Sequence, residues 1–372
     1  MSSDPNPDPI PLSRVELDDE IRERVMAAVD SGRYILGPEC QAFEQELAAY
    51  FGVEHCTLVA NATSALMLAL HGMGIEPGDE VIVPSHTAFP TIEAIFNAGA
   101  TPVFADTDET HTVDPTVVRS LITPRTKLLL PVHLFGQPCD MDALLAIADE
   151  HGLRVLEDCA QAHGAQDKGR KLGSMGDAGV LSFYASKNLP VMGDGGAMLT
   201  NNGKLAERVR MLRNHGRRDK HTHEIVGWNL RFNDIQAASG RVFLERLDAR
   251  NSARRATSAI YRERLAVAPI GLPAEREGVH HVYHLFVIET DRRDQLAKHL
   301  ADRRIQTGVH YPIPNHLQPG TRSRLGGAAP KLPHTEEAAE RILSLPMFPS
   351  LEARDAERVA NAVLDFFAGH SS

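Results

Sequence analysis

The chain has 372 residues, of which 42% are apolar and 24% are charged, a balance typical of a soluble globular protein. This length allows two domains, or one large α/β domain with an appendage. The formal net charge of −10 argues against a general nucleic-acid-binding surface.

Membrane and metal-binding functions also find little support in the sequence. The apolar stretches are short and interrupted by charges, and the start at 1–11 is polar, proline-rich and acidic, unlike a signal peptide. The four cysteines are scattered and form no C-x-x-C pair, which favours reduced thiols in a cytoplasmic enzyme over a disulfide framework or a zinc site. We therefore expect no membrane partner, no nucleic-acid partner and no metal.

The region from about residue 40 to 200 alternates short apolar strands with helical patterns. We predict strands at 56–59, 80–83, 102–105, 128–133, 155–158, 180–183 and 197–200. Helices with apolar residues at i, i+3 and i+4 lie between several of them, as in 141–148, which Gly152 closes. This alternation predicts an α/β fold with three layers, in which a mostly parallel sheet is covered by helices on both faces.

The pattern changes after residue 233. One long helix is predicted from Asn233, as its cap, to about Leu265, followed after Pro273 by a smaller α+β region with a strand at 282–290 and a helix at 293–304. We expect an N-terminal tail (1–14), a large domain (15–250) and a small C-terminal domain (251–372).

Two short segments carry the chemistry. Asp158 ends a predicted strand, where ligands bind in open parallel sheets, and Lys187 follows in the hydroxyl-rich turn Ser182-Phe183-Tyr184-Ala185-Ser186. Pyridoxal 5'-phosphate (PLP) chemistry needs this pair of groups, because a lysine amine forms a Schiff base with the cofactor aldehyde and a carboxylate pairs with the pyridine nitrogen. The plainer alternatives are a solvated lysine and an acid that caps a helix.

The two segments and their order resemble the PLP-dependent nucleotide-sugar aminotransferases of the DegT/DnrJ/StrS type, which have the aspartate-aminotransferase fold (fold type I). The resemblance covers nearly the whole chain. It implies that Lys187 and Asp158 are catalytic and that Gln161 reaches the ring hydroxyl of the cofactor. For His163, direct contact and a buried supporting position remain open.

The resemblance also implies a phosphate site. Asn61, Ala62 and Thr63 lie between a strand and a helix, where backbone amides can bind an anion, and Ser182 is a second phosphate ligand. Ala62 stands where most of the family has glycine. Asn229 corresponds to an asparagine that reaches the phosphate of the neighbouring subunit, which implies a homodimer with shared active sites.

Two further segments concern the ring and the substrate. The family often has an aromatic residue at the place of Ala88 that stacks on the cofactor; here Phe89 follows instead, and either Phe89 or His86 could line the site. His310 and Tyr311 are expected to face the sugar. The segment 307–319 resembles members that act on 3-keto sugars slightly more than those that act on 4-keto sugars.

The resemblance implies that an amino acid, L-glutamate, donates its amino group to the keto sugar of a nucleotide-sugar, in amino sugar biosynthesis. A cyclitol ketone as acceptor stays open. A PLP-dependent sugar dehydratase of the same fold would have histidine in place of Lys187, and a non-catalytic relative would lack the lysine or the acid.

Overall fold

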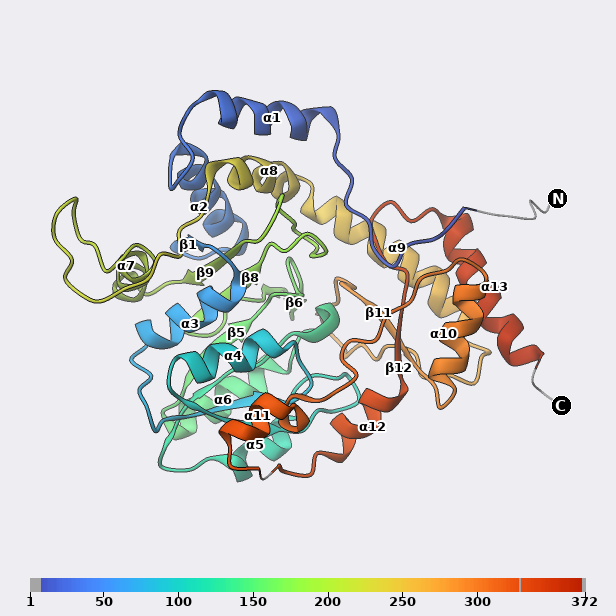
Figure 1. Cartoon of the computed structure of the whole chain (residues 1–372). Helices are drawn as coiled ribbons and strands as arrows, with labels where there is room; N and C mark the ends of the chain where they lie inside the picture. Colours follow the sequence, from blue (N-terminus) through green and yellow to red (C-terminus); the bar gives the residue numbers. More distant parts are fainter. Residues whose placement is uncertain (1–7, 328, 370–372) are drawn as a thin grey trace.

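The computed structural model describes residues 8–327 and 329–369. Its centre is a seven-stranded sheet of order β1-β9-β8-β5-β4-β2-β3 (Figure 1). The strands are β1 (His55–Val59), β2 (Glu80–Pro84), β3 (Thr101–Ala105), β4 (Thr126–Leu129), β5 (Arg154–Asp158), β8 (Ala178–Ser182) and β9 (Gly196–Thr200). The reversed strand is β9, which is antiparallel to β1 and β8, whereas the remaining neighbours pair in parallel. All seven predicted strands are confirmed, although β4 ends at Leu129 and not at His133.

Helices cover both faces of this sheet because strand side chains alternate between the faces. Ile82 of β2 packs into one apolar cluster, while its neighbours Val81 and Val83 pack into another. The first cluster is covered by α2 (Pro38–Phe51), α5 (Pro115–Leu121), α6 (Met141–His151) and α8 (Asp234–Glu245), with α1 (Asp19–Asp30) outside α8. The second is covered by α3 (Ala62–Gly72), α4 (Phe89–Asn97) and α7 (Gly203–Leu212). Three layers result, as predicted. Among the described residues no helix combines the length and the hydropathy needed to cross a bilayer.

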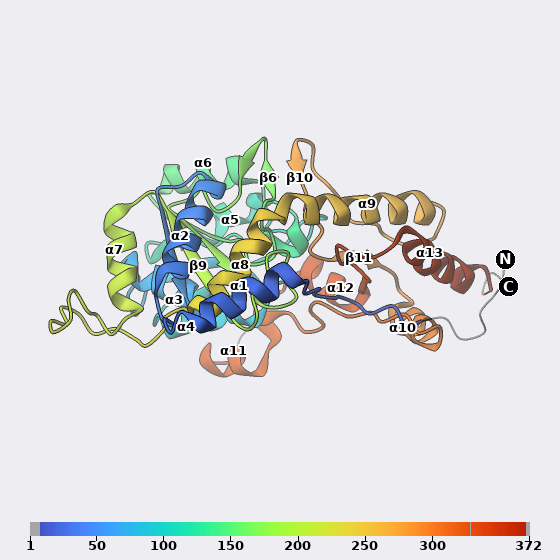
Figure 2. The ribbon, with the colours of Figure 1, turned by 90° about the horizontal axis from the view of Figure 1, so that it is seen from above.

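The prediction of one helix from Asn233 to Leu265 was wrong. The segment forms α8 and then α9 (Leu247–Leu265), separated at Arg246, whose backbone leaves the helical region at φ −101° and ψ 1°. The Asn233 side chain makes no cap and instead donates to Gln236 Oε1 at 2.8 Å. Arg246 is drawn to the acids before and in α1, with Nη1 2.5 Å from Asp18 Oδ2. Beyond the break, α9 runs past the sheet into the C-terminal region (Figure 2).

A smaller α+β region follows. Its antiparallel pair consists of β11 (Phe286–Glu289) and β12 (Ile342–Leu345), so only the second half of the strand predicted at 282–290 is extended in a ladder. A third apolar cluster joins this pair to α9, α10 (Arg293–Asp302) and α13 (Ala353–Ala368). Three further helical elements of this region are η2 (Asn315–Leu317), α11 (Pro319–Arg324) and α12 (Pro333–Arg341). We propose that the domain boundary lies near residue 250, inside α9.

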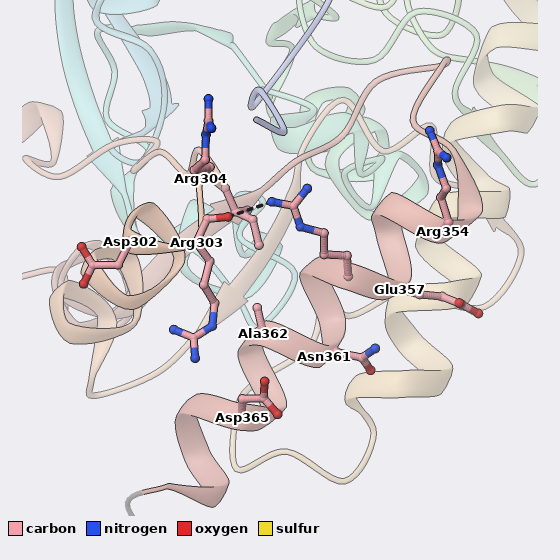
Figure 3. A pocket seen from close by; sticks show the side chains of 10 residues that line it. Asp302, Arg303, Arg304, Arg354, Glu357, Asn361, Ala362 and Asp365 are labelled. Atoms are coloured by element: carbon pink, nitrogen blue, oxygen red, sulfur yellow. Dashed lines mark hydrogen bonds between the residues drawn. The ribbon is translucent and has the colours of Figure 1, made fainter. Parts of the chain in front are cut away.

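The part of the predicted N-terminal tail that the structure describes is packed. Ile10 is 3% exposed, belongs to the third apolar cluster and forms a parallel bridge with Ile305. Arg358 of α13 donates to the carbonyl oxygens of Asp8, at 2.7 Å, and of Arg303, at 2.8 Å. Figure 3 shows the second of these bonds beside a pocket of about 540 Å³ between α10 and α13, whose lining includes none of the predicted site residues. Residues 1–7 of the tail lie outside the described residues.

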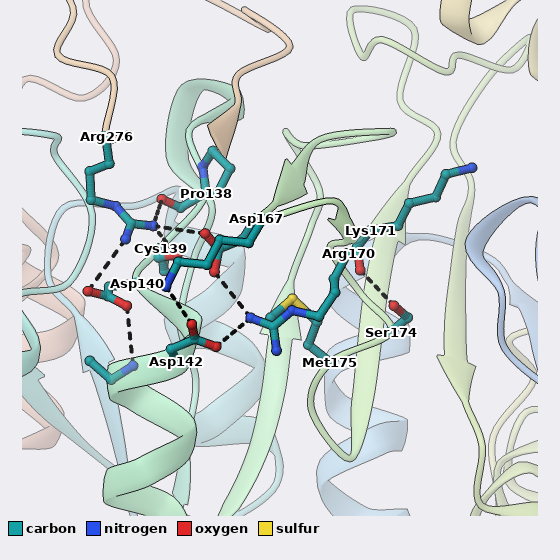
Figure 4. Close-up of polar contacts among 12 residues, drawn as sticks. Pro138, Cys139, Asp140, Asp142, Asp167, Arg170, Lys171, Ser174, Met175 and Arg276 are labelled. Atoms are coloured by element: carbon teal, nitrogen blue, oxygen red, sulfur yellow. Dashed lines mark hydrogen bonds and ion pairs between the residues drawn. The ribbon is translucent and has the colours of Figure 1, made fainter. Parts of the chain in front are cut away.

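A three-stranded sheet that the sequence did not predict lies beside the centre. It consists of β10 (Val279–His280), β6 (Gln166–Asp167) and β7 (Arg170–Lys171). Charged groups connect it to α6, because Asp142 accepts from Lys168 Nζ at 2.6 Å and also from Arg170. Arg276 lies between two acids: its Nη1 is 3.4 Å from Asp140 Oδ2, and its Nη2 is 3.9 Å from Asp167 Oδ1 (Figure 4). These contacts fix the chain between the end of β5 and the start of β8.

The turn before β8 is held by a buried acid. Glu157 of β5 accepts hydrogen bonds from three backbone amides of the turn 173–176, each at 2.8 Å. His133 Nδ1 accepts the Cys139 N–H at 3.0 Å, so Nε2 carries the hydrogen and donates to Glu157 at 3.2 Å. Burial opposes the charge of Glu157, but the bond from His133 and these amides keep its pKa below the ordinary value. Glu157 is therefore a buried carboxylate with four donors.

Replacing Glu157 by Gln should destabilise the protein by about 2–4 kcal/mol, because the amide's own N–H₂ group would face backbone donors. The loss should appear as a lower midpoint in urea denaturation. Because the pKa of Glu157 is depressed in the folded state, its contribution should be present at neutral pH and disappear as the pH falls below the ordinary carboxyl range. Glu337→Gln, which removes an exposed ion pair with Arg341, is the matched control and should change the midpoint little. Equal midpoints for both variants would contradict this role of Glu157.

Candidate active site

Asp158 and Lys187 meet at the carboxyl ends of neighbouring strands. Asp158 is the last residue of β5, and Lys187 lies in the turn after β8, where its N–H donates to Tyr184 O at 2.8 Å. Burial lowers the pKa of Lys187 to about 8, against the opposing effect of the Asp158 charge. The predicted pair is thus brought together, with an amine that is far easier to deprotonate than an exposed lysine.

Asp158 itself is 3% exposed and is held by two donors. Its Oδ1 accepts the Ala160 N–H at 3.0 Å, and its Oδ2 accepts the Thr91 hydroxyl at 2.9 Å. Burial raises the pKa of Asp158, while the bonds from Ala160 and Thr91 and the charge of Lys187 oppose that rise. The sequence analysis missed Thr91, because the sequence does not indicate that the start of α4 lies beside the end of β5.

The predicted phosphate ligands gather at the start of α3. Asn61 caps this helix by accepting the Ser64 N–H at 2.8 Å, which leaves the first-turn amides of Ala62 and Thr63 without an intrahelical acceptor. A Cβ atom at Gly196 would lie 2.5 Å from the Asn61 carbonyl carbon, so glycine is required for this close approach of β9. Ser182 is paired with Gly196 in the β8–β9 ladder. Strand ends and helix start therefore form one corner whose free amides could bind an anion.

A hydrogen bond between Gln161 and Tyr311 joins the segment after β5 to the C-terminal region. Gln161 Oε1 accepts the Phe135 N–H at 2.8 Å, and its Nε2 donates to Tyr311 Oη at 3.2 Å. Burial and then the Asp158 charge raise the pKa of Tyr311 to about 12, so the phenol stays protonated at neutral pH. The predicted substrate residue Tyr311 therefore lies beside the predicted cofactor residue Gln161.

His86 and His310, the two predicted histidines beside Tyr311, differ in their burial and in their hydrogen bonds. His86 is fully buried, and its Nε2 accepts the Tyr311 N–H at 3.1 Å, so this nitrogen is already engaged. His310 is partly buried, with Nδ1 2.9 Å from Ser344 Oγ. His86 thus supports the backbone of the substrate segment, and His310 is fixed from β12.

His163 is fully buried, and neither of its ring nitrogens has a hydrogen-bond partner within the described residues. Burial, and then the charge of Lys187, lower its pKa to about 3, so the ring is neutral. Its centroid lies 6.2 Å from that of Phe183. An unpartnered neutral imidazole near Lys187 has a donor and an acceptor available for a bound group.

Asn229 and Phe89 make no hydrogen bond to Asp158 or Lys187 among the described residues, although Leu230, beside Asn229, accepts the Ala60 N–H at 3.1 Å. Asn229 is exposed in the loop 213–230, which projects from the molecule at the left of Figure 1, and it forms a bridge with Asn214. Phe89 is 38% exposed and extends toward α11, since a Cβ on Gly320 would be 3.9 Å from Phe89 Cζ.

His133, Glu157 and Cys159 are close enough together to suggest metal ligands. Hydrogen bonds already use both nitrogens of His133 and both carboxylate oxygens of Glu157. This donor set therefore serves the turn before β8 and does not favour an ion.

Relatives of known activity match the chain over nearly its full length. The dTDP-3-amino-3,4,6-trideoxy-alpha-D-glucose transaminase of Streptomyces venezuelae is 49% identical, over 94% of this chain and 93% of its own. The UDP-N-acetyl-3-dehydro-alpha-D-glucosamine 3-aminotransferase of Acidithiobacillus ferrooxidans is 42% identical, over 93% and 94% of the two chains.

Solved structures agree with the fold. DesV of S. venezuelae, crystallised in complex with a ketimine intermediate, superposes with a TM-score of 0.93 at 48% identity, covering 96% of this chain and 98% of that chain. NtdA of Bacillus subtilis, with bound cofactor PMP, gives a TM-score of 0.88 at 32% identity, covering 94% and 82%.

The family model for DegT/DnrJ/EryC1/StrS aminotransferases matches residues 15–364. PLP is the cofactor of this family, and the residues present fit it: an anion-binding corner at α3, an unpartnered His163, a buried carboxylate and a lysine with a lowered pKa. The chain belongs to the DegT/DnrJ/EryC1/StrS aminotransferase family and is a PLP-dependent aminotransferase.

Proposed function

We infer that this enzyme transfers an amino group from L-glutamate to the keto sugar of a nucleotide-sugar, with C-3 of the sugar as the site of amination. The observation that carries this proposal is the meeting of Lys187, Asp158 and the start of α3 at one edge of the sheet. The two named relatives act on a dTDP-linked and a UDP-linked sugar, and both names place the amino group at C-3, which supports the 3-keto preference. Its place is amino sugar biosynthesis in the cytoplasm.

Each predicted residue has a task in this proposal. Bound PLP would supply an aldehyde that links to an amine and a ring that accepts electrons. Asn61, Ala62, Thr63 and Ser182 bind the phosphate, Asp158 holds the ring nitrogen in its protonated form, and Gln161 directs its amide to the ring hydroxyl. Lys187 anchors the cofactor and afterwards moves the proton at the substrate carbon.

The substrate lies on the side of Tyr311 and His310. Tyr311 is fixed from two directions, through its hydroxyl by Gln161 and through its backbone by His86. A protonated phenol beside Gln161 can donate to or accept from a sugar hydroxyl. His163 offers its free nitrogens to the cofactor or to the substrate.

The working unit is a homodimer with shared sites. The loop 213–230 projects from its own subunit, and Val226 at 93% exposure and the exposed Asn229 lie on it (Figure 1). A projecting loop with an exposed apolar residue is suited to a second copy of the chain. Asn229 would then donate its side-chain amide to the phosphate in the partner's site.

The substrate proposal is tested by running the reaction in reverse. Purified enzyme with 2-oxoglutarate is given dTDP- or UDP-linked 3-amino sugars, the matching 4-amino sugars, or cyclitol amines, and the absorbance of the cofactor is followed. The 3-amino compounds should react fastest, and Lys187→Ala should not turn over with any of them. Faster reaction of the 4-amino sugars would overturn the C-3 preference, and reaction of the cyclitol amines alone would exclude a nucleotide-sugar as the substrate.

The pKa of Lys187 gives a second prediction. Only the neutral amine attacks an aldehyde, and the pKa of about 8 places half of this lysine in that form near pH 8. Covalent capture of added PLP by cofactor-free enzyme should therefore speed up as the pH rises through about 8. Borohydride reduction and peptide mapping should find the label on Lys187, and Lys187→Ala should carry none. A label on another lysine, or a rise only near the ordinary lysine range, would be the contrary result.

Shared sites are tested by mixing two inactive variants. Lys187→Ala removes the anchoring amine, and Asn229→Asp places a negative charge near the phosphate. In a mixed dimer with shared sites, one site carries both changes and the other carries neither. Activity should reappear in proportion to the fraction of mixed dimers, which is measured by mass spectrometry. If subunits exchange and activity stays absent, each site is built from one chain only.

A further inference from the structure

Thr91 forms a direct hydrogen bond to the acid at the end of β5. It lies in the first turn of α4, is 2% exposed, and its Oγ1 is 2.9 Å from Asp158 Oδ2. An ionised carboxylate can only accept, so the hydroxyl hydrogen of Thr91 points at Asp158. The bond leaves the threonine oxygen free to accept from a third group.

The group that can donate to the Thr91 oxygen is the hydroxyl of Thr87. Its Oγ1 is 3.3 Å from Thr91 Oγ1, and it is 3% exposed. Because the hydrogen of Thr91 is directed to Asp158, Thr87 is the donor of this longer bond. Thr87 is itself fixed, since its carbonyl oxygen accepts from Asn315 Nδ2 at 2.8 Å. A short relay therefore runs from the Thr87 hydroxyl through the Thr91 hydroxyl to Asp158, and Asn315 holds the backbone of Thr87.

The relay acts on an acid whose ionised form burial disfavours. Burial raises the pKa of Asp158, and the hydrogen bonds from Ala160 and Thr91 are the two largest effects that oppose this rise. The start of α4 adds the positive end of a helix dipole on the same side. A hydrogen bond donated to a charged acceptor changes such an equilibrium about ten- to hundredfold.

We propose that Thr91 is a positioning residue that keeps the shared proton on the pyridine nitrogen of the cofactor and off the Asp158 carboxylate. This rests on the proposed function, in which Asp158 faces that nitrogen. With its hydroxyl bond the carboxylate is the weaker base of the pair, so the ring carries the charge. Without the bond the proton passes to Asp158, and the ring becomes a poorer electron acceptor.

The test replaces Thr91 by Val, which keeps the branched shape and removes the hydroxyl. Enzyme loaded with PLP labelled with nitrogen-15 in the ring is measured by nitrogen NMR, since the resonance of a protonated pyridine nitrogen differs strongly from that of a free one. In Thr91→Val the resonance should move toward the unprotonated position, and the half-reaction with L-glutamate should slow about tenfold or more. Thr91→Ser should restore both. Thr91→Ala gives the same readout should the valine variant fail to fold.

Thr57→Val is the matched control. Thr57 is a fully buried threonine of β1 whose hydroxyl has no partner within the described residues, so its loss should leave the ring resonance unchanged. Asp158→Asn separates two kinds of failure. A protonated ring nitrogen in Asp158→Asn would show that Asp158 is misassigned. If the ring is unprotonated in Asp158→Asn but the nitrogen resonance of Thr91→Val equals that of Thr57→Val, the relay alone would be overturned.

Discussion

The architecture depends on two adjacent carboxylates at the end of β5 that must both be buried. Successive side chains of a strand point to opposite faces, so Glu157 and Asp158 meet different surroundings. Glu157 is surrounded by N–H donors from the turn 173–176 and from His133, and it fixes how the chain enters β8. Asp158 faces α4 and has two donors within the part of the chain that the structure describes, and the charge of Lys187 also favours its ionised form. Glu157 has a hydrogen-bond donor at each oxygen and supports the fold, whereas Asp158 can still accept a hydrogen bond from the protonated pyridine ring of the cofactor.

The features that could be predicted from the sequence are those that a few neighbouring residues determine. The seven strands of the central sheet follow from short apolar runs separated by turns, and Asp158 and Lys187 follow from the residue types at two strand ends. Asn61 was predicted as a phosphate ligand from its place between strand and helix; the structure shows that it caps α3, and its binding to phosphate stays a prediction. These features are local, so a few neighbouring residues are enough to show them. The site as a whole was predicted only with the help of the family resemblance.

The features that were missed depend on residues far apart in the chain. Thr91 lies 67 positions from Asp158, and nothing around it indicates a carboxylate partner. The break at Arg246 responds to acids near the start of the chain, which helical periodicity cannot register. The small sheet of β6, β7 and β10 combines two-residue strands from distant segments, too short to give an alternating pattern. Charges such as Asp142 and Arg276 hold it against α6.

The packing of Ile10 has a consequence for the order in which the chain can fold. Ile10 joins an apolar cluster whose other members come from residues 261–366, and Arg358 of the last helix holds the carbonyl of Asp8. During synthesis the ribosome releases the N-terminal segment first, yet its docking surface is complete only when α13 has emerged. The residues of the central sheet, in contrast, are all made by Thr200. The large sheet can therefore form before the segment around Ile10 has a surface to pack against. The packing of that segment is among the final events of folding.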